Sequence, residues 1–126
     1  TSLEQNLKQQ FISIVNNDSA PLFLDFHSTS EDIFYTQRDE DQTFPLLFTK
    51  RWLKGIQEHF PNYAFKRDAE HNENLPTSKT WAFKTFGCAG ITYEFGYNTN
   101  IEKVRAIASG AAEEMMKILV AETASR

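Results

Sequence analysis

The chain of 126 residues is 40% hydrophobic and contains eleven phenylalanines, so it is long enough to form one domain with a buried core. Its formal net charge of −4 and its scattered basic residues give no basis for nucleic-acid binding. The single cysteine, Cys88, excludes an internal disulfide bond and a cysteine-rich zinc site.

No repeat or linker interrupts the sequence, so residues 1–126 are predicted to form a single domain. No apolar run reaches the length of a membrane span and no signal peptide opens the chain, so no membrane partner is predicted, and cytoplasmic, periplasmic and secreted locations stay open. Because the chain starts at Thr1 without a methionine, we expect a processed product or a piece of a longer protein, with an upstream segment as a partner.

The first third of the chain predicts one helix and two strands. Residues 22–26 are apolar except for Asp25, and such a run is typical of a strand buried on both faces. A second short strand is predicted at residues 33–35. The amphipathic first helix is predicted from apolar residues at helical spacing, which are Leu3, Leu7, Phe11, Ile14 and Val15.

The middle of the chain predicts a second helix that begins at Thr43 and Pro45. Residues 63–65 predict a short strand, and residues 67–78 predict a long loop of the kind that often serves as a functional lid. The apolar stripe of the helix consists of Phe44, Phe48, Trp52 and Ile56.

The C-terminal third predicts a strand and a long helix. The strand lies within residues 87–96, which read GCAGITYEFG. Thr99 and Glu102 have the spacing of a capping box at the start of the helix. Its apolar stripe consists of Ile101, Val104, Ala108, Ala111, Met115 and Ile118.

Two residues are candidates for chemistry. His27 follows the first predicted strand, and ligands bind at the carboxyl ends of strands in open α/β sheets. It fits a metal ligand or a catalytic base, and it equally fits a histidine that caps the strand through local hydrogen bonds. Glu94 shares one strand face with Thr92, where it could take a proton from a zinc-bound water. An ordinary exposed glutamate at a strand end is the alternative.

A catalytic zinc site needs three protein ligands, and the sequence around His27 does not supply them. Neither His59 nor His71 begins an HxxE or HExxH pattern. Cys88 lies between a glycine and an alanine, which favours a buried, inert thiol. The residues alone therefore predict a site built from His27 and Glu94, with ligands missing.

Three segments in order resemble the zinc metallocarboxypeptidases of the carboxypeptidase A-like family. FLDFHSTSEDIFYT is similar to the family segment that carries the third zinc ligand, and AGITYEFG is similar to the strand that ends in its catalytic glutamate. TSKTWAF resembles the turn that precedes this strand, with Trp81 at the family's distance before Glu94. The resemblance covers nearly the whole chain but only the C-terminal half of a catalytic domain.

The resemblance implies an α/β fold, namely part of a mixed, mostly parallel sheet flanked by helices. It implies that His27 is a zinc ligand, that Glu94 is the general base and acid, and that Ser28 and Lys79 contact the substrate. Lys79 corresponds to the base of the pocket for the terminal side chain of the substrate, where a lysine favours Asp or Glu. The alternative is that residues 78–80 form an exposed turn with a solvated lysine.

The function implied is zinc-dependent hydrolysis of a C-terminal peptide bond, or of a small amide, with zinc polarising the carbonyl and activating the water. The family's HxxE ligands, its carboxylate-binding arginines and its mobile tyrosine have no counterpart here, so the isolated chain is expected to be inactive. Two alternatives stay open: an amidohydrolase similar to aspartoacylase or succinylglutamate desuccinylase, and a non-catalytic binding module on a carboxypeptidase-like scaffold.

Overall fold

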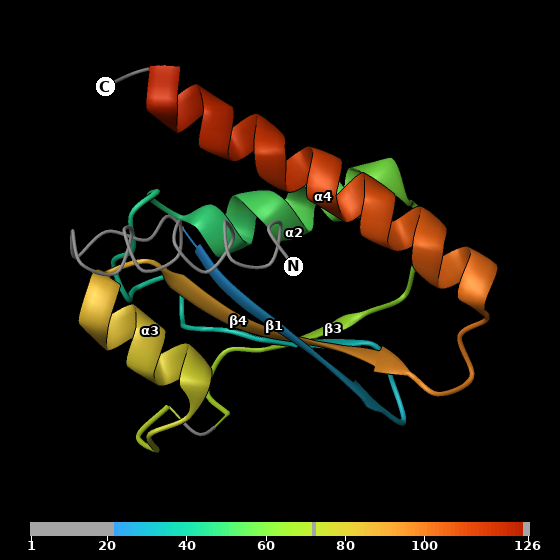
Figure 1. Cartoon of the computed structure of the whole chain (residues 1–126), viewed down its shortest axis with the longest axis horizontal. Coiled ribbons are helices and arrows are strands. Elements are labelled where there is room, and N and C mark those ends of the chain that lie inside the picture. The colour runs from blue at the N-terminus through green and yellow to red at the C-terminus, as the bar shows by residue number, and fades with distance from the viewer. Residues whose placement is uncertain (1–21, 72, 125–126) are drawn as a thin grey trace, which may run out of the picture.

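The computed structural model describes residues 22–71 and 73–124, without the side chains of residues 123 and 124. A four-stranded sheet separates two helical layers (Figure 1). Helices α2 (Phe48–His59) and α4 (Ile101–Ala124) cover one face, and α3 (Ser78–Phe86) lies on the other. The predicted first helix lies outside the described residues. No described helix is both long and apolar enough to cross a membrane.

The sheet is mixed, with more parallel than antiparallel pairing. Its strands are β1 (Leu22–Thr29), β2 (Ile33–Tyr35), β3 (Lys66–Asp68) and β4 (Ala89–Gly96), in the order β1-β4-β2-β3. β1 pairs parallel to β4, β2 pairs parallel to β3, and β2 and β4 run antiparallel. This arrangement confirms the expected α/β fold with a mixed, mostly parallel sheet.

The core lies between the sheet and the layer formed by α2 and α4. Phe34 stacks on Tyr93 with ring centroids 3.8 Å apart, and it meets Trp52 edge-on. The indole Nε1 of Trp52 donates a 2.8 Å hydrogen bond to the carbonyl of Ala111, which ties α2 to α4. The predicted stripe residues Phe48, Trp52 and Ile56 are therefore core residues.

The expectation that β1 is buried on both faces is wrong. β1 is the outer strand of the described sheet and continues through His27 to Thr29. Phe26 packs against the rings of Tyr93 and Phe95, yet 60% of it is exposed. A short apolar run looks the same in sequence whether its strand lies inside a sheet or at its edge.

Two element boundaries differ from the prediction in the middle of the chain. Helix α2 begins at Phe48 because Leu47 adopts a left-handed conformation with φ 52°, which a helix cannot include. The strand predicted at residues 63–65 lies instead at Lys66–Asp68, since Tyr63 turns its ring into the core before the strand begins. The long loop accordingly starts after β3.

The predicted turn around Trp81 is wrong, because the segment folds into helix α3. Gly87 ends this helix in a left-handed conformation with φ 70°, a position that suits glycine. The predicted strand that follows is confirmed as Ala89–Gly96.

The predicted capping box of α4 is also wrong. The side-chain oxygen of Asn100 accepts a 2.8 Å hydrogen bond from the N–H of Lys103, so Asn100 is the cap. The hydroxyl of Thr99 donates a hydrogen bond to Asp32 and caps no backbone N–H of α4 among the described residues. Of the predicted stripe, Ile101 is 62% exposed, while the buried residue at this end of the helix is Ile107.

Asp32 joins four segments of the fold through its carboxylate. It accepts hydrogen bonds from the hydroxyl of Tyr63, the N–H of Gly96 and the hydroxyl of Thr99. The Tyr63 hydroxyl in turn lies 2.6 Å from that of Tyr93, and burial is the first cause that raises the pKa values of both tyrosines. The network therefore holds neutral phenols around one carboxylate.

We expect Asp32→Ala to lower the free energy of unfolding by about 2–4 kcal/mol, since it leaves partly buried donors without an acceptor. Urea denaturation followed by tryptophan fluorescence measures the change. Asp39→Ala is the control, because Asp39 makes one exposed ion pair, with Arg67, and should change stability little. Equal stability of the two variants would contradict a structural role for the Asp32 network.

Candidate functional site

The sheet brings His27 and Glu94 side by side. The two residues are paired Cα partners across the parallel strands β1 and β4, and Asp25 is paired in the same way with Thr92. Because Tyr93 points into the core, its neighbour Glu94 lies on the opposite face, the face that carries α3. The face predicted for Glu94 from strand alternation is therefore the face observed.

A cavity of about 340 Å³ lies on this face, near the carboxyl ends of β1 and β4. Its walls come from three strands, the start of α3 and the turn after β3. Sequence reasoning placed His27, Glu94 and Lys79 in one site, and all three line this cavity. Asp25, Tyr35 and His71 line it as well, although they were not chosen from the sequence.

Among the described residues, Asp25 is the charged residue that forms an ion pair with His27. The Oδ2 atom of Asp25 lies 3.5 Å from Nε2 of His27, whose side chain is 56% exposed. The Oδ1 atom of Asp25 is buried and has no hydrogen-bond partner among the described residues. Asp25 can therefore orient the imidazole of His27. The sequence signal that could have identified Asp25 is a carboxylate two residues before His27 within an otherwise apolar strand.

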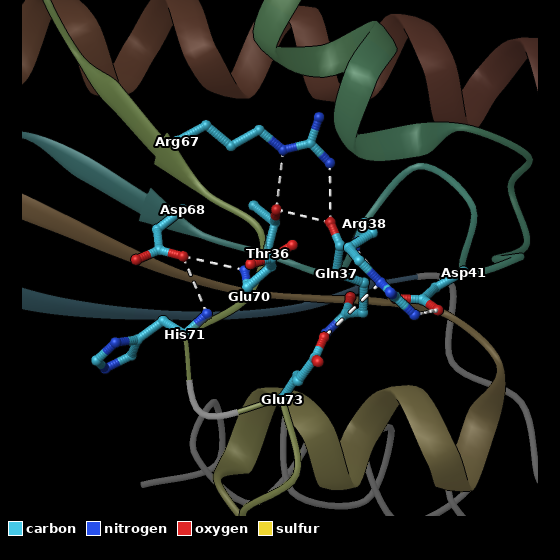
Figure 2. Close-up of polar contacts among 9 residues, drawn as sticks. All are labelled: Thr36, Gln37, Arg38, Asp41, Arg67, Asp68, Glu70, His71 and Glu73. Carbon is cyan, nitrogen blue, oxygen red and sulfur yellow. Dashed lines mark hydrogen bonds and ion pairs between the residues drawn. The ribbon is translucent and has the colours of Figure 1, made fainter.

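His71 reaches the cavity from the turn after β3. Asp68 Oδ1 accepts the N–H groups of Glu70 and His71 at 3.0 Å each, which fixes this turn (Figure 2). The imidazole packs against Tyr35 with ring centroids 4.3 Å apart. Burial, followed by the charges of Glu94, Asp68 and Glu31, raises the pKa of the Tyr35 hydroxyl. The position of His71 could not be inferred from a motif because it depends on β3 lying beside β2.

Lys79 is buried in the cavity wall, with 3% of its surface exposed. The alternative of an exposed turn at residues 78–80 is therefore wrong, because this segment forms the first turn of α3 against the sheet. Burial lowers the pKa of the Lys79 ammonium, and the charges of Asp68 and Glu73 partly oppose that shift. Ser28 is exposed and does not line the cavity, so its role in substrate binding stays a prediction.

The described residues do not fit a metal ion by themselves. A catalytic zinc site takes three protein ligands, and residues 22–71 and 73–124 contain no group of three His, Cys, Asp or Glu side chains that could hold an ion. The donors at hand are the His27 imidazole, which Asp25 already approaches, and the neighbouring Glu94 carboxylate. Cys88 is fully buried and burial raises its pKa, as expected for an inert thiol.

The fold resembles that of a solved metallo-carboxypeptidase. A crystal structure of a metallo-carboxypeptidase from Burkholderia cenocepacia superposes on this chain with a TM-score of 0.55 and 13% sequence identity. The match covers 90% of this chain and 33% of that one, so the chain spans about a third of that protein. No family model and no curated protein matches the sequence. The chain therefore has part of a carboxypeptidase-like fold.

Proposed function

We propose that this chain forms part of a zinc-dependent carboxypeptidase-like hydrolase that cleaves a C-terminal peptide bond or a related amide. The observation that carries the proposal is the pairing of His27 with Glu94 at the mouth of a cavity, near the carboxyl ends of two parallel strands. The likeness of the fold to a metallo-carboxypeptidase supports it. In this proposal His27 is one zinc ligand, and the remaining ligands come from outside the described residues.

Glu94 is the proposed general base. Its carboxylate is partly buried beside His27, and the cavity in front of it has room for a water molecule and the end of a substrate. From this position it can take a proton from an attacking water and then give that proton to the leaving amine. Lys79 contacts the substrate from the wall of the same cavity.

His27→Ala in the full-length protein tests the proposed metal ligand. Loss of a partner in the second coordination shell commonly costs about 10–100-fold in metal affinity, so removal of a direct ligand should cost more than that. Zinc content after dialysis against a weak chelator, measured by mass spectrometry, reports the change. His59→Ala is the matched control, because His59 ends α2 and pairs with Glu114 away from the cavity.

Retention of zinc by His27→Ala would contradict the proposed ligand. Substrate choice in the same preparation separates the alternatives. Release of C-terminal amino acids from peptides supports the carboxypeptidase, whereas cleavage of N-acyl amino acids alone favours the amidohydrolase similar to aspartoacylase. Ligand binding without zinc and without turnover favours the non-catalytic binding module.

A further inference from the structure

Tyr35 lines the cavity of His27 and Glu94 from a neighbouring strand. Its neighbour Phe34 is buried in the core, so Tyr35 lies on the opposite face of β2, the face that carries α3. Tyr35 is the Cα partner of Thr92 across the antiparallel strands β2 and β4, which makes Glu94 its diagonal neighbour. Diagonal neighbours lie about 7–8 Å apart, within reach of an aromatic side chain. The phenol and the Glu94 carboxylate therefore approach one space.

The ring of Tyr35 is held in place by residues that follow β3. The imidazole of His71 packs against it with ring centroids 4.3 Å apart and an angle of 34° between the planes. Asp68 fixes the backbone of His71 by accepting its N–H at 3.0 Å (Figure 2). Asp68 is also the Cα partner of Tyr35 in the parallel register of β2 and β3. Tyr35 thus has the rigid support that a side chain needs to contact reacting atoms.

The hydroxyl of Tyr35 is a hydrogen-bond donor that no group within residues 22–71 and 73–124 accepts. Burial raises the pKa of the phenol, and the negative charges of Glu94, Asp68 and Glu31 raise it further. The phenol therefore stays protonated at neutral pH and keeps its O–H to donate. Thr77 lines the same cavity, but its hydroxyl already donates to Thr80 at 3.1 Å.

We propose that Tyr35 is a catalytic residue, and that its hydroxyl donates a hydrogen bond to the carbonyl oxygen of the bond that is cleaved. This inference rests on the proposed function and adds a residue to the same site. In the proposed reaction Glu94 takes a proton from water, and the water oxygen forms a bond to the carbonyl carbon. The electron pair of the C=O π bond then moves to the carbonyl oxygen, which becomes negatively charged.

A fixed donor stabilises this oxygen more strongly once it is negatively charged than while it is a neutral carbonyl. The Tyr35 hydroxyl keeps its own proton throughout, so it differs in role from Glu94, which accepts and returns one. The effect of the hydroxyl is therefore expected on turnover rather than on the binding of the uncleaved peptide.

Tyr35→Phe in the full-length protein tests this role, because it removes the hydroxyl and keeps the ring that packs against His71. We expect kcat for a C-terminal peptide substrate to fall about 10²–10³-fold, as for other single donors to such an oxygen, with KM changed much less. A phosphonate analogue of the peptide carries negative charge on a tetrahedral oxygen. Calorimetric titration should show that Tyr35→Phe binds it about 10- to 100-fold more weakly. The affinity for the product peptide should stay the same.

Tyr97→Phe is the matched control, because Tyr97 is 71% exposed and lies outside the cavity. Circular dichroism checks that each variant is folded. Wild-type kcat and phosphonate affinity in Tyr35→Phe, together with lost turnover in Glu94→Gln, would overturn the role of Tyr35 and leave the proposed function standing. An equal loss of affinity for the phosphonate and the product peptide would also overturn it. Normal turnover in Glu94→Gln would instead contradict the proposed function, and a wild type that binds no phosphonate would contradict both.

Discussion

Glu94→Gln in the full-length protein should lower kcat for a C-terminal peptide substrate by about 10²–10⁴-fold, which is the usual contribution of general acid–base catalysis to the rate. The amide keeps the shape of the carboxylate but cannot accept a proton from water. Because Glu94 is proposed to serve both the attack of water and the departure of the amine, its loss affects both steps. Steady-state kinetics on one peptide substrate measure the change, and KM should change much less than kcat.

Glu31→Gln is the matched control, because it makes the same chemical change on an exposed glutamate that pairs with Lys66 outside the cavity. Zinc content should stay at the wild-type level in both variants, which distinguishes loss of the base from loss of the metal. If Glu94→Gln kept nearly normal kcat, Glu94 would not be the base.

Gly90→Ala is expected to be the most destabilising single substitution considered for this fold. A Cβ atom at this position would lie 2.1 Å from the carbonyl oxygen of Lys79, a contact with backbone that no side-chain rotation can relieve. Overpacking typically costs 1–3 kcal/mol and sometimes more, and a clash between two backbones places this case at about 3 kcal/mol or above. Chemical denaturation measures the loss of stability.

Gly87→Ala provides the comparison. A Cβ atom there meets nothing within 4 Å, so only the left-handed backbone, with φ 70°, opposes the substitution, at a cost of about 1 kcal/mol. Gly90→Ala should also displace the start of α3, whereas Gly87→Ala should not. Similar stability of the two variants would show that α3 moves away from β4 without cost.

The central pair of the site was predictable from local patterns. Alternation along residues 91–95 placed Glu94 opposite the core, and the polar stretch after residues 22–26 marked His27. Both inferences need only the geometry of a single strand. The parallel register that pairs His27 with Glu94 is a property of the tertiary structure. The sequence suggested that the two residues lie close together only through resemblance to a family.

Long-range contacts and local backbone conformation explain the errors at helix starts. Thr99 and Glu102 have the spacing of a capping box, but the Thr99 hydroxyl donates to Asp32, which is distant in sequence, and Asn100 is the cap. Helix α2 likewise starts later than predicted because Leu47 is left-handed. A local motif indicates which hydrogen bonds a residue can make, and the tertiary fold determines which of these partners it contacts.

By itself the sequence determined the alternation of strands and helices, the apolar faces that form the core, and His27 and Glu94 as candidates for chemistry. Only the tertiary structure placed β1 at an edge, brought His71 to the cavity and buried Lys79 in the cavity wall. The reason is that hydrophobic periodicity reports which face of an element is buried, whereas the burial of a polar residue depends on neighbours from other elements. For Lys79 that neighbour is Gly90, whose missing side chain lets the first turn of α3 approach β4.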